Sequence, residues 1–251
     1  MISRTDKILI LIAVLVLIGL TFEVIYFYYN WPKGDEIIVK QEVIVKEKQP
    51  LEKKEEPAIE EPVLPEHVDL SVPFTSQAPF GDWSYPFNHT CEEAAVLMVH
   101  YYLSAKTSVD PGSVRNDLLD MVAYELKTYG FHEDTSAEQT AQFVRDYYGY
   151  QAKVMYDISS EDIKKELAKG NPIVIPSAGR MLGNPYFTGA GPLYHMLTIK
   201  GYNSNGFITN DPGTKRGADY FYSYDVLMGS IHDWNNGDVN NGKSAIIIIE
   251  K

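Results

Sequence analysis

Cysteine is almost absent from this chain of 251 residues, and positive charge is scarce. A single cysteine, Cys91, excludes an internal disulfide and therefore a disulfide framework. Lysine and arginine total 22 against 34 aspartates and glutamates, which gives a formal net charge of −12. So acidic a chain is a poor partner for nucleic acid, whose binding depends on phosphate neutralisation.

A recognisable metal site is also missing from the sequence. The five histidines other than His195 show no spacing typical of metal ligands. The Asp- and Asn-rich segment 233–238 lacks the glycine offset and the terminal glutamate of a calcium loop, so turn chemistry explains it better. We therefore expect no metal and no cofactor.

Long hydrophobic runs are lacking except at the N-terminus. Arg4 and Lys7 precede an uncharged run, and about 22 mainly apolar residues can cross a ~30 Å hydrocarbon core. Residues 8–31 are predicted to be a transmembrane anchor, with residues 1–7 cytoplasmic by the positive-inside rule and the rest of the chain extracytoplasmic. A cleaved signal peptide is the alternative, but no Ala-x-Ala-like site follows the run. A lipid-anchored N-terminus is excluded because no cysteine lies near it.

Composition changes sharply after the anchor. Residues 32–66 are rich in Glu, Lys and Pro and cannot bury enough apolar surface to fold alone, which predicts a disordered linker. An Ile/Val-rich repeat at 36–46 has a six-residue offset, which fits no heptad, and it receives no functional assignment. Residues 67–251 are long enough for one globular domain with a sizeable core.

Helices are predicted first and strands later in this domain, which is an α+β order. One predicted helix begins at Cys91, and three more cover about 111–129, 136–148 and 160–169. Predicted strands, taken to form an antiparallel sheet, cover 151–156, 172–176, 194–202, 206–209, 218–222 and 244–250.

Cys91 is a candidate nucleophile because of its place in the first of these helices. Thr90 to Glu93 matches a capping box, and an apolar stripe at helical spacing follows. A thiol in the first helical turn faces unpaired backbone N–H groups and the positive end of the helix dipole, which favour a thiolate. Such a nucleophile needs an imidazole as its base.

The candidate base is His195, at the start of a predicted hairpin. The turn 203–206 returns the chain, so that the end of the second strand lies beside the start of the first. Asp211, or Asn210, can then reach the imidazole nitrogen that does not face the thiol. Nucleophile, base and orienting group therefore occur in the order Cys91, His195, Asp211.

These residues, with their flanking motifs, resemble a known family. Val72 to Gln77, Trp83, Cys91 to Ala94, Tyr194-His195 and Asn210 to Gly213 are similar to the papain-like cysteine peptidases related to double-glycine leader peptidases (bacteriocin-processing peptidases). The resemblance begins near residue 70 and implies a papain-like fold, with an N-terminal helical part bearing the cysteine and a C-terminal antiparallel sheet bearing histidine and aspartate. It implies that Cys91, His195 and Asp211 form the triad and that Gln77 donates to the oxyanion.

Two departures from the family pattern stand near the nucleophile. Fourteen positions separate Gln77 from Cys91, and Glu92 follows the cysteine where a glycine is common. A loop must fold back to bring the Gln77 amide to the site. The backbone N–H of Cys91 can serve as one oxyanion donor in any case.

The sequence thus predicts a membrane-anchored extracytoplasmic thiol hydrolase, a cysteine peptidase acting on a peptide or protein substrate. Trp83, Tyr85 and Tyr194 are candidate substrate-binding residues, and the loop 177–193 is either a cleft wall or an ordinary connection. Two alternatives stay open: a cell-wall amidase or acyltransferase on the same scaffold, and a catalytically inactive binding module.

Overall fold

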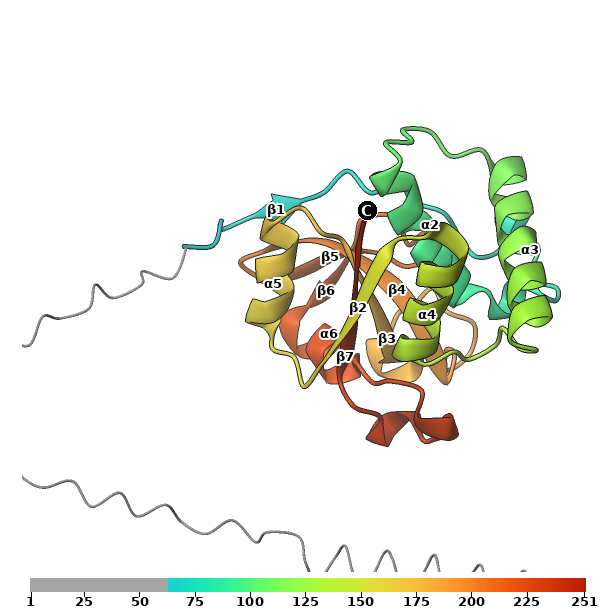
Figure 1. The fold of residues 1–251 in the computed structure, drawn as a ribbon. Coiled ribbons are helices and arrows are strands. Elements are labelled where there is room, and N and C mark those ends of the chain that lie inside the picture. The colour runs from blue at the N-terminus through green and yellow to red at the C-terminus, as the bar shows by residue number, and fades with distance from the viewer. Residues whose placement is uncertain (1–62) are drawn as a thin grey trace, which may run out of the picture. The chain divides into compact units, whose positions relative to one another are not determined.

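The computed structural model describes residues 63–251, which form the domain drawn in colour in Figure 1. The predicted anchor 8–31 and nearly all of the predicted linker 32–66 lie outside the described residues. Among the helices of residues 63–251, none combines the length and apolar character needed to cross a bilayer.

Five α-helices and seven strands make up the domain. The helices are α2 (Cys91–Leu103), α3 (Pro111–Thr128), α4 (Ala137–Tyr148), α5 (Ser160–Ala168) and α6 (Tyr224–Ser230). The strands are β1 (Val68–Asp69), β2 (Gln151–Tyr156), β3 (Ile173–Ala178), β4 (Tyr194–Asn203), β5 (Gly206–Asn210), β6 (Tyr220–Ser223) and β7 (Ala245–Glu250). The predicted segments are confirmed to within about two residues at each end, whereas α6 and β1 were not predicted.

All strand pairs of the sheet are antiparallel, in the order β2-β7-β3-β4-β5-β6. The α+β class with an antiparallel sheet is thereby confirmed. The last strand, β7, lies between β2 and β3, and its run of isoleucines suits a central strand buried on both faces.

Side chains that alternate in direction along the central strands build two hydrophobic cores, one on each face of the sheet. Ile173 and Ile175 of β3 pack with α5 and α6, whereas Val174 packs with α2, α3 and α4. Successive side chains of a strand point to opposite faces, so one uninterrupted apolar strand serves both cores. Figure 1 shows the resulting layers, with α5 and α6 on one side of the sheet and α2 to α4 on the other.

The chain enters the domain through β1, which pairs with the far half of β4. Val68 lies opposite Tyr202 and Asp69 opposite Gly201. A Cβ on Gly201 would lie 2.2 Å from the Val68 carbonyl oxygen, so only glycine permits this close approach. Lys200 closes the contact with an ion pair from Nζ to Asp69 Oδ1 at 2.6 Å.

Side chains close in sequence cap the N-termini of most of the helices. Ser136 and Ser159 form capping boxes at the starts of α4 and α5, and the Asp110 side chain accepts the Ser113 N–H at the start of α3. The capping box predicted at Thr90 and Glu93 is wrong, because the Thr90 side chain makes no cap bond to α2. Both side chains are buried and make tertiary contacts instead.

Candidate active site

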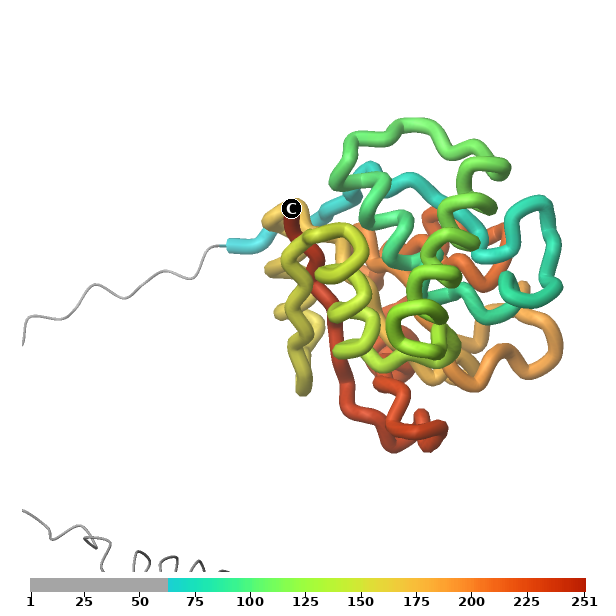
Figure 2. The backbone as a smooth tube through the Cα atoms, turned by 45° about the vertical axis from the view of Figure 1, so that its right-hand side comes forward, coloured from blue at the N-terminus to red at the C-terminus, as the bar shows by residue number. Residues whose placement is uncertain are grey.

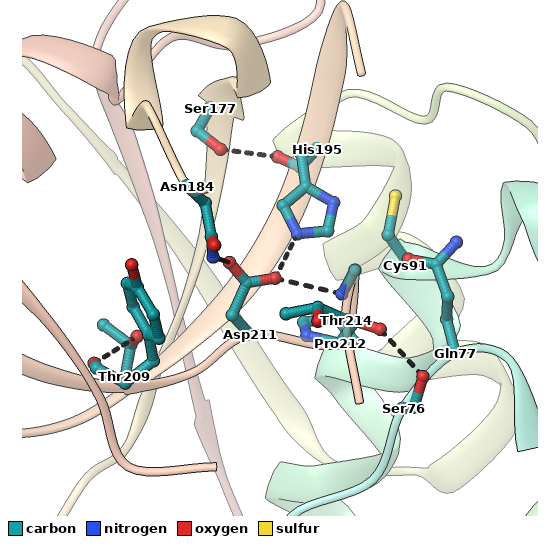
Figure 3. Close-up of polar contacts among 12 residues, drawn as sticks. Ser76, Gln77, Cys91, Ser177, Asn184, His195, Thr209, Asp211, Pro212 and Thr214 are labelled. Atoms are coloured by element: carbon teal, nitrogen blue, oxygen red, sulfur yellow. Dashed lines mark hydrogen bonds and ion pairs between the residues drawn. The ribbon is translucent and has the colours of Figure 1, made fainter. Parts of the chain in front are cut away.

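The β4–β5 hairpin brings His195 and Asp211 together, as predicted. Ile199 pairs with Thr209 and Thr198 with Asn210, so the residue after β5 comes back beside the start of β4. His195 Nε2 lies 2.7 Å from Asp211 Oδ1. The ring therefore turns its other nitrogen, Nδ1, toward Cys91, as Figure 3 shows. The alternative partner Asn210 is used elsewhere, since its amide donates to the Val72 carbonyl.

Asp211 is fully buried and accepts four hydrogen bonds. Oδ1 accepts from His195 and from the Gly213 N–H at 3.0 Å, and Oδ2 accepts from Tyr222 at 2.7 Å and from Asn184 at 3.1 Å. Burial alone would raise the pKa of Asp211, but the His195 charge and these donors outweigh it and hold the pKa below its usual value. The carboxyl is thus a fixed anion that orients the imidazole.

Cys91 begins α2, as predicted, with its sulfur facing the His195 ring (Figure 3). The Sγ atom donates to Glu92 Oε2 at 3.0 Å. The expectation that the helix terminus favours a thiolate is wrong for this state of the site. Burial, the Glu92 charge and the thiol–carboxylate bond raise the pKa of Cys91 well above its usual value.

Gln77 reaches the site although it lies fourteen positions before Cys91. The intervening segment folds back through two short turns, η1 (Pro79–Gly81) and η2 (Phe87–His89). Gln77 is buried, its N–H donates to the Pro212 carbonyl at 3.0 Å, and its own carbonyl accepts from Thr90 Oγ1 at 3.1 Å. Its side-chain amide donates to the Phe87 carbonyl at 3.0 Å, and a second amide hydrogen is available to a substrate oxygen.

A cavity of about 720 Å³ joins these groups. Figure 2 shows the two segments that wall it, residues 78–90 and the loop before β4, on the same side of the domain. The lining includes Gln77, Trp83, Cys91, Glu92, Asp134, Tyr186, Phe187, Leu193, Tyr194, His195, Lys215 and Trp234. The second half of the predicted loop 177–193, residues 186–193, is therefore a cleft wall.

Of the three candidate substrate-binding residues, Trp83 and Tyr194 line the cavity and Tyr85 does not. Tyr85 projects its ring to the surface and its hydroxyl lies 3.2 Å from His132 Nε2. Tyr85 is therefore not part of the cavity lining in this structure, and its hydroxyl is engaged by His132.

Gly213 fits tightly against the imidazole. A Cβ at this position would lie 2.9 Å from His195 Cε1 and 2.9 Å from Phe187 Cε1. The turn that follows Asp211 therefore has room for hydrogen only, and the ring of His195 is confined between Asp211 and this turn.

Sequence reasoning missed a set of buried polar residues around Cys91, His195 and Asp211. Glu93 Oε1 lies 3.1 Å from His132 Nδ1, and Glu125 of α3 is buried beside it. Asn184 and Tyr222, which complete the shell of Asp211, lie in a loop and in an edge strand that carry no motif. Only Glu92 and Glu93 offered a signal, since two adjacent carboxylates follow the cysteine directly.

An α+β fold that sets a cysteine at a helix N-terminus against a histidine–aspartate pair on an antiparallel sheet is the arrangement of the papain-like cysteine peptidases. The chain belongs to the Peptidase C39-like family, whose family model matches residues 69–238. Membership assigns it at a coarse level to the hydrolases of the cysteine peptidase type.

One solved structure similar to this chain is that of a Bacillus anthracis protein described as a C39-like peptidase. The two share 19% identity, with 74% of this chain and 99% of that chain covered and a TM-score of 0.47. No protein among the curated sequences matches the chain significantly.

Proposed function

We propose that this protein is a cysteine peptidase in which Cys91 is the nucleophile, His195 the base and Asp211 the orienting residue. The observation that carries the proposal is the His195 Nε2 to Asp211 Oδ1 contact of 2.7 Å, which leaves Nδ1 on the side of Cys91 in the same cavity. Gln77 and the backbone N–H of Cys91 supply the oxyanion donors.

The chemistry follows from these positions. His195 Nδ1 takes the proton of the Cys91 thiol, and the sulfur attacks the carbonyl carbon of the scissile amide. The imidazolium then gives its proton to the leaving amine, and a thioester to Cys91 remains. Water, deprotonated by His195, attacks the thioester, and the carboxylic acid and the free thiol are released.

The walls of the cavity support a polypeptide substrate. Trp83, Tyr186 and Leu193 are each between 43% and 46% exposed along its lining. Aromatic and aliphatic groups at a cleft rim bury the side chains of an extended peptide, while few polar groups fix its backbone. A peptide of the cell wall falls within the same class.

The location of the enzyme is part of the proposal. We propose that residues 8–31 anchor the protein in the membrane and that the catalytic domain lies on the outer face, because Arg4 and Lys7 precede the apolar run. In intact spheroplasts an added protease is expected to degrade the domain and to spare a cytoplasmic marker. Protection of the domain until the membrane is lysed would contradict this orientation.

The catalytic assignment is tested by the rate at which iodoacetamide alkylates Cys91 in the full chain held in detergent. At pH 7 we expect fast alkylation that falls at least about tenfold in His195→Ala, because the base that creates the thiolate is gone. His67→Ala is the matched control, since His67 is exposed and distant in sequence from the site, and its rate should equal that of the wild type.

Hydrolysis of a fluorogenic peptide mixture completes the test. Cys91→Ala is expected to abolish turnover, whereas His67→Ala is expected to leave it unchanged. Turnover of a peptidoglycan fragment without any turnover of peptides would identify a cell-wall amidase instead. Slow alkylation that ignores His195 would identify an inactive binding module and overturn the proposal.

A further inference from the structure

Glu92 touches the reacting atom of the site, although the catalytic steps above do not use it. Its Oε2 accepts the Cys91 thiol at 3.0 Å, and the residue lines the same cavity while being only 3% exposed. In this state the thiol proton is directed to Glu92, although the sulfur also faces the imidazole of His195 (Figure 3).

The Glu92 carboxyl is held in place from a second element. Its other oxygen, Oε1, accepts the backbone N–H of Thr135 at 3.2 Å, in the loop between α3 and α4. The Thr135 carbonyl in turn accepts the hydroxyl of Tyr194 at 2.9 Å, and Tyr194 directly precedes His195. The position of the acid is therefore coupled to the strand that carries the base.

The surroundings of Glu92 are acidic. Within residues 63–251 no lysine or arginine forms an ion pair with it. Burial first, and then the charge of Glu93, raise the pKa of Glu92 to about 8. The titratable groups around it are Cys91 and Glu93 of α2, Glu125 of α3, Asp134 of the following loop, Tyr194 and His195 of β4, and His89 and Lys215 at the cavity wall.

We propose that Glu92 is a further catalytic residue that controls the nucleophile through its own proton. As a carboxylate it accepts the thiol hydrogen bond and holds Cys91 at rest. As a neutral acid it donates its proton in a hydrogen bond to the thiolate sulfur, while His195 holds the proton taken from Cys91. The inference rests on the proposed function, since it requires Cys91 and His195 to act as nucleophile and base.

The sign of the pH effect follows from the charges. A carboxylate 3.0 Å from the sulfur repels a thiolate there, and its hydrogen bond keeps the proton on the thiol. Reactivity that depends on His195 is therefore present while Glu92 is protonated. It declines as the pH rises through about 8, where Glu92 loses its proton.

The test is the pH profile of Cys91 alkylation by iodoacetamide between pH 6 and 10, in the full chain. The wild type is expected to lose at least about threefold in rate between pH 7 and 9. Glu92→Gln keeps the length and a donor group but cannot ionise, so its rate should not fall, and at pH 9 it should exceed the wild type about tenfold. Glu93→Gln should still show a fall, but at lower pH, because the charge of Glu93 contributes to the raised pKa of Glu92. Glu138→Gln, at an exposed residue of α4 paired with Arg145, is the matched control and should retain the fall of the wild type.

A second variant separates the effect of the Glu92 charge from the effect of its hydrogen-bond donor. Glu92→Met has similar length, no charge and no donor, so it should lose the fall with pH and show a lower rate than Glu92→Gln throughout. A melting curve of each variant establishes that the domain is folded, and Glu92→Met takes the place of Glu92→Gln if the latter does not fold.

Failure of the proposed function can be distinguished from failure of the role proposed for Glu92. If alkylation of the wild type at pH 7 is unaffected by His195→Ala, the proposed function itself fails. If alkylation depends on His195 but the profiles of the wild type and Glu92→Gln coincide, only the role of Glu92 is overturned. A slower Glu92→Gln at every pH would likewise contradict it, since the carboxylate would then assist the thiolate.

Discussion

Replacing Asp211 by alanine is expected to abolish most of the activity and much of the stability of the domain. We expect kcat/KM to fall by at least about 10³, because the imidazole loses the carboxylate that fixes its orientation and stabilises its charged form. The free energy of unfolding should fall by about 3–5 kcal/mol, the usual result of removing one partner from a buried ion pair. Peptide hydrolysis and urea unfolding of the same preparation measure the two effects.

The stability loss has a specific structural cause. Alanine removes the acceptor of four hydrogen bonds, donated by the His195 ring N–H, the Gly213 N–H, the Tyr222 hydroxyl and the Asn184 amide, of which only the Asn184 amide keeps another acceptor, the Tyr222 hydroxyl. All four face a site that water does not reach readily, since Asp211 and His195 are exposed by 0% and 1%. Unsatisfied donors at such depth cost about 1–3 kcal/mol each before relaxation.

Asp211→Asn is the informative control, because it removes the charge and retains an acceptor. Its carbonyl oxygen can stay on the His195 side, and the Tyr222 hydroxyl can rotate to accept the new amide. The Asn184 amide loses Oδ2 as an acceptor but keeps the Tyr222 hydroxyl. We therefore expect a loss in kcat/KM of only about tenfold and a folded domain. If Asp211→Ala hydrolysed peptides at the wild-type rate, Asp211 would have no part in orienting the base.

Replacing Glu125 by glutamine is expected to stabilise the protein, and more so as the pH rises. Glu125 lies 2% exposed beside Glu93, and each carboxyl has its Oε2 atom without a hydrogen-bond partner. Two carboxylates can only accept, so a proton retained on Glu125 supplies the missing donor. Burial first, and then the charge of Glu93, raise the pKa of Glu125 to about 11.

The sign of the effect is set by proton linkage. The folded protein keeps on Glu125 a proton that the unfolded chain releases above its usual pKa of 4.5. Stability from this group is therefore complete below pH 4.5 and falls as the pH rises toward 11. A glutamine amide donates to Glu93 without binding a proton, so Glu125→Gln should gain about 1–3 kcal/mol at pH 8 and nearly nothing at pH 4.5.

Thermal or urea unfolding at several pH values measures this gain. Glu138→Gln is the matched control on α4, where Glu138 is an exposed partner of Arg145, and its effect should stay within about 0.5 kcal/mol at every pH. If Glu125→Gln were instead less stable than the wild type at pH 8, Glu125 would be ionised in the folded protein.

The hairpin half of the site could be predicted from sequence because its determinants are local. A turn at 203–206 between two apolar runs fixes the register, and the register decides that Asp211 lies near His195. The start of the helix at Cys91 was predictable for the same reason. Local capping signals, however, gave the wrong partners for Thr90 and Glu93, since burial against distant segments replaced the expected cap.

The other features of the fold and of the site depend on contacts between segments far apart in the chain. The insertion of β7 between β2 and β3 has no local signal, because an apolar strand fits any central position of a sheet. Asn184 and Tyr222 meet Asp211 only after the loop 183–193 and the edge strand are in place. The effect of Glu92 on Cys91 also escaped prediction, since charged residues in a first helical turn are usually solvated.

The pairing of β1 with β4 decides from which direction the cleft can be approached. The upstream chain joins the domain opposite Gly201 and Tyr202, and His195 begins the same strand six residues earlier. At about 3.3 Å per residue, the point of attachment and the catalytic base stand some 20 Å apart along one rigid strand. The segment that leads into β1 is therefore held away from the end of β4 that carries His195.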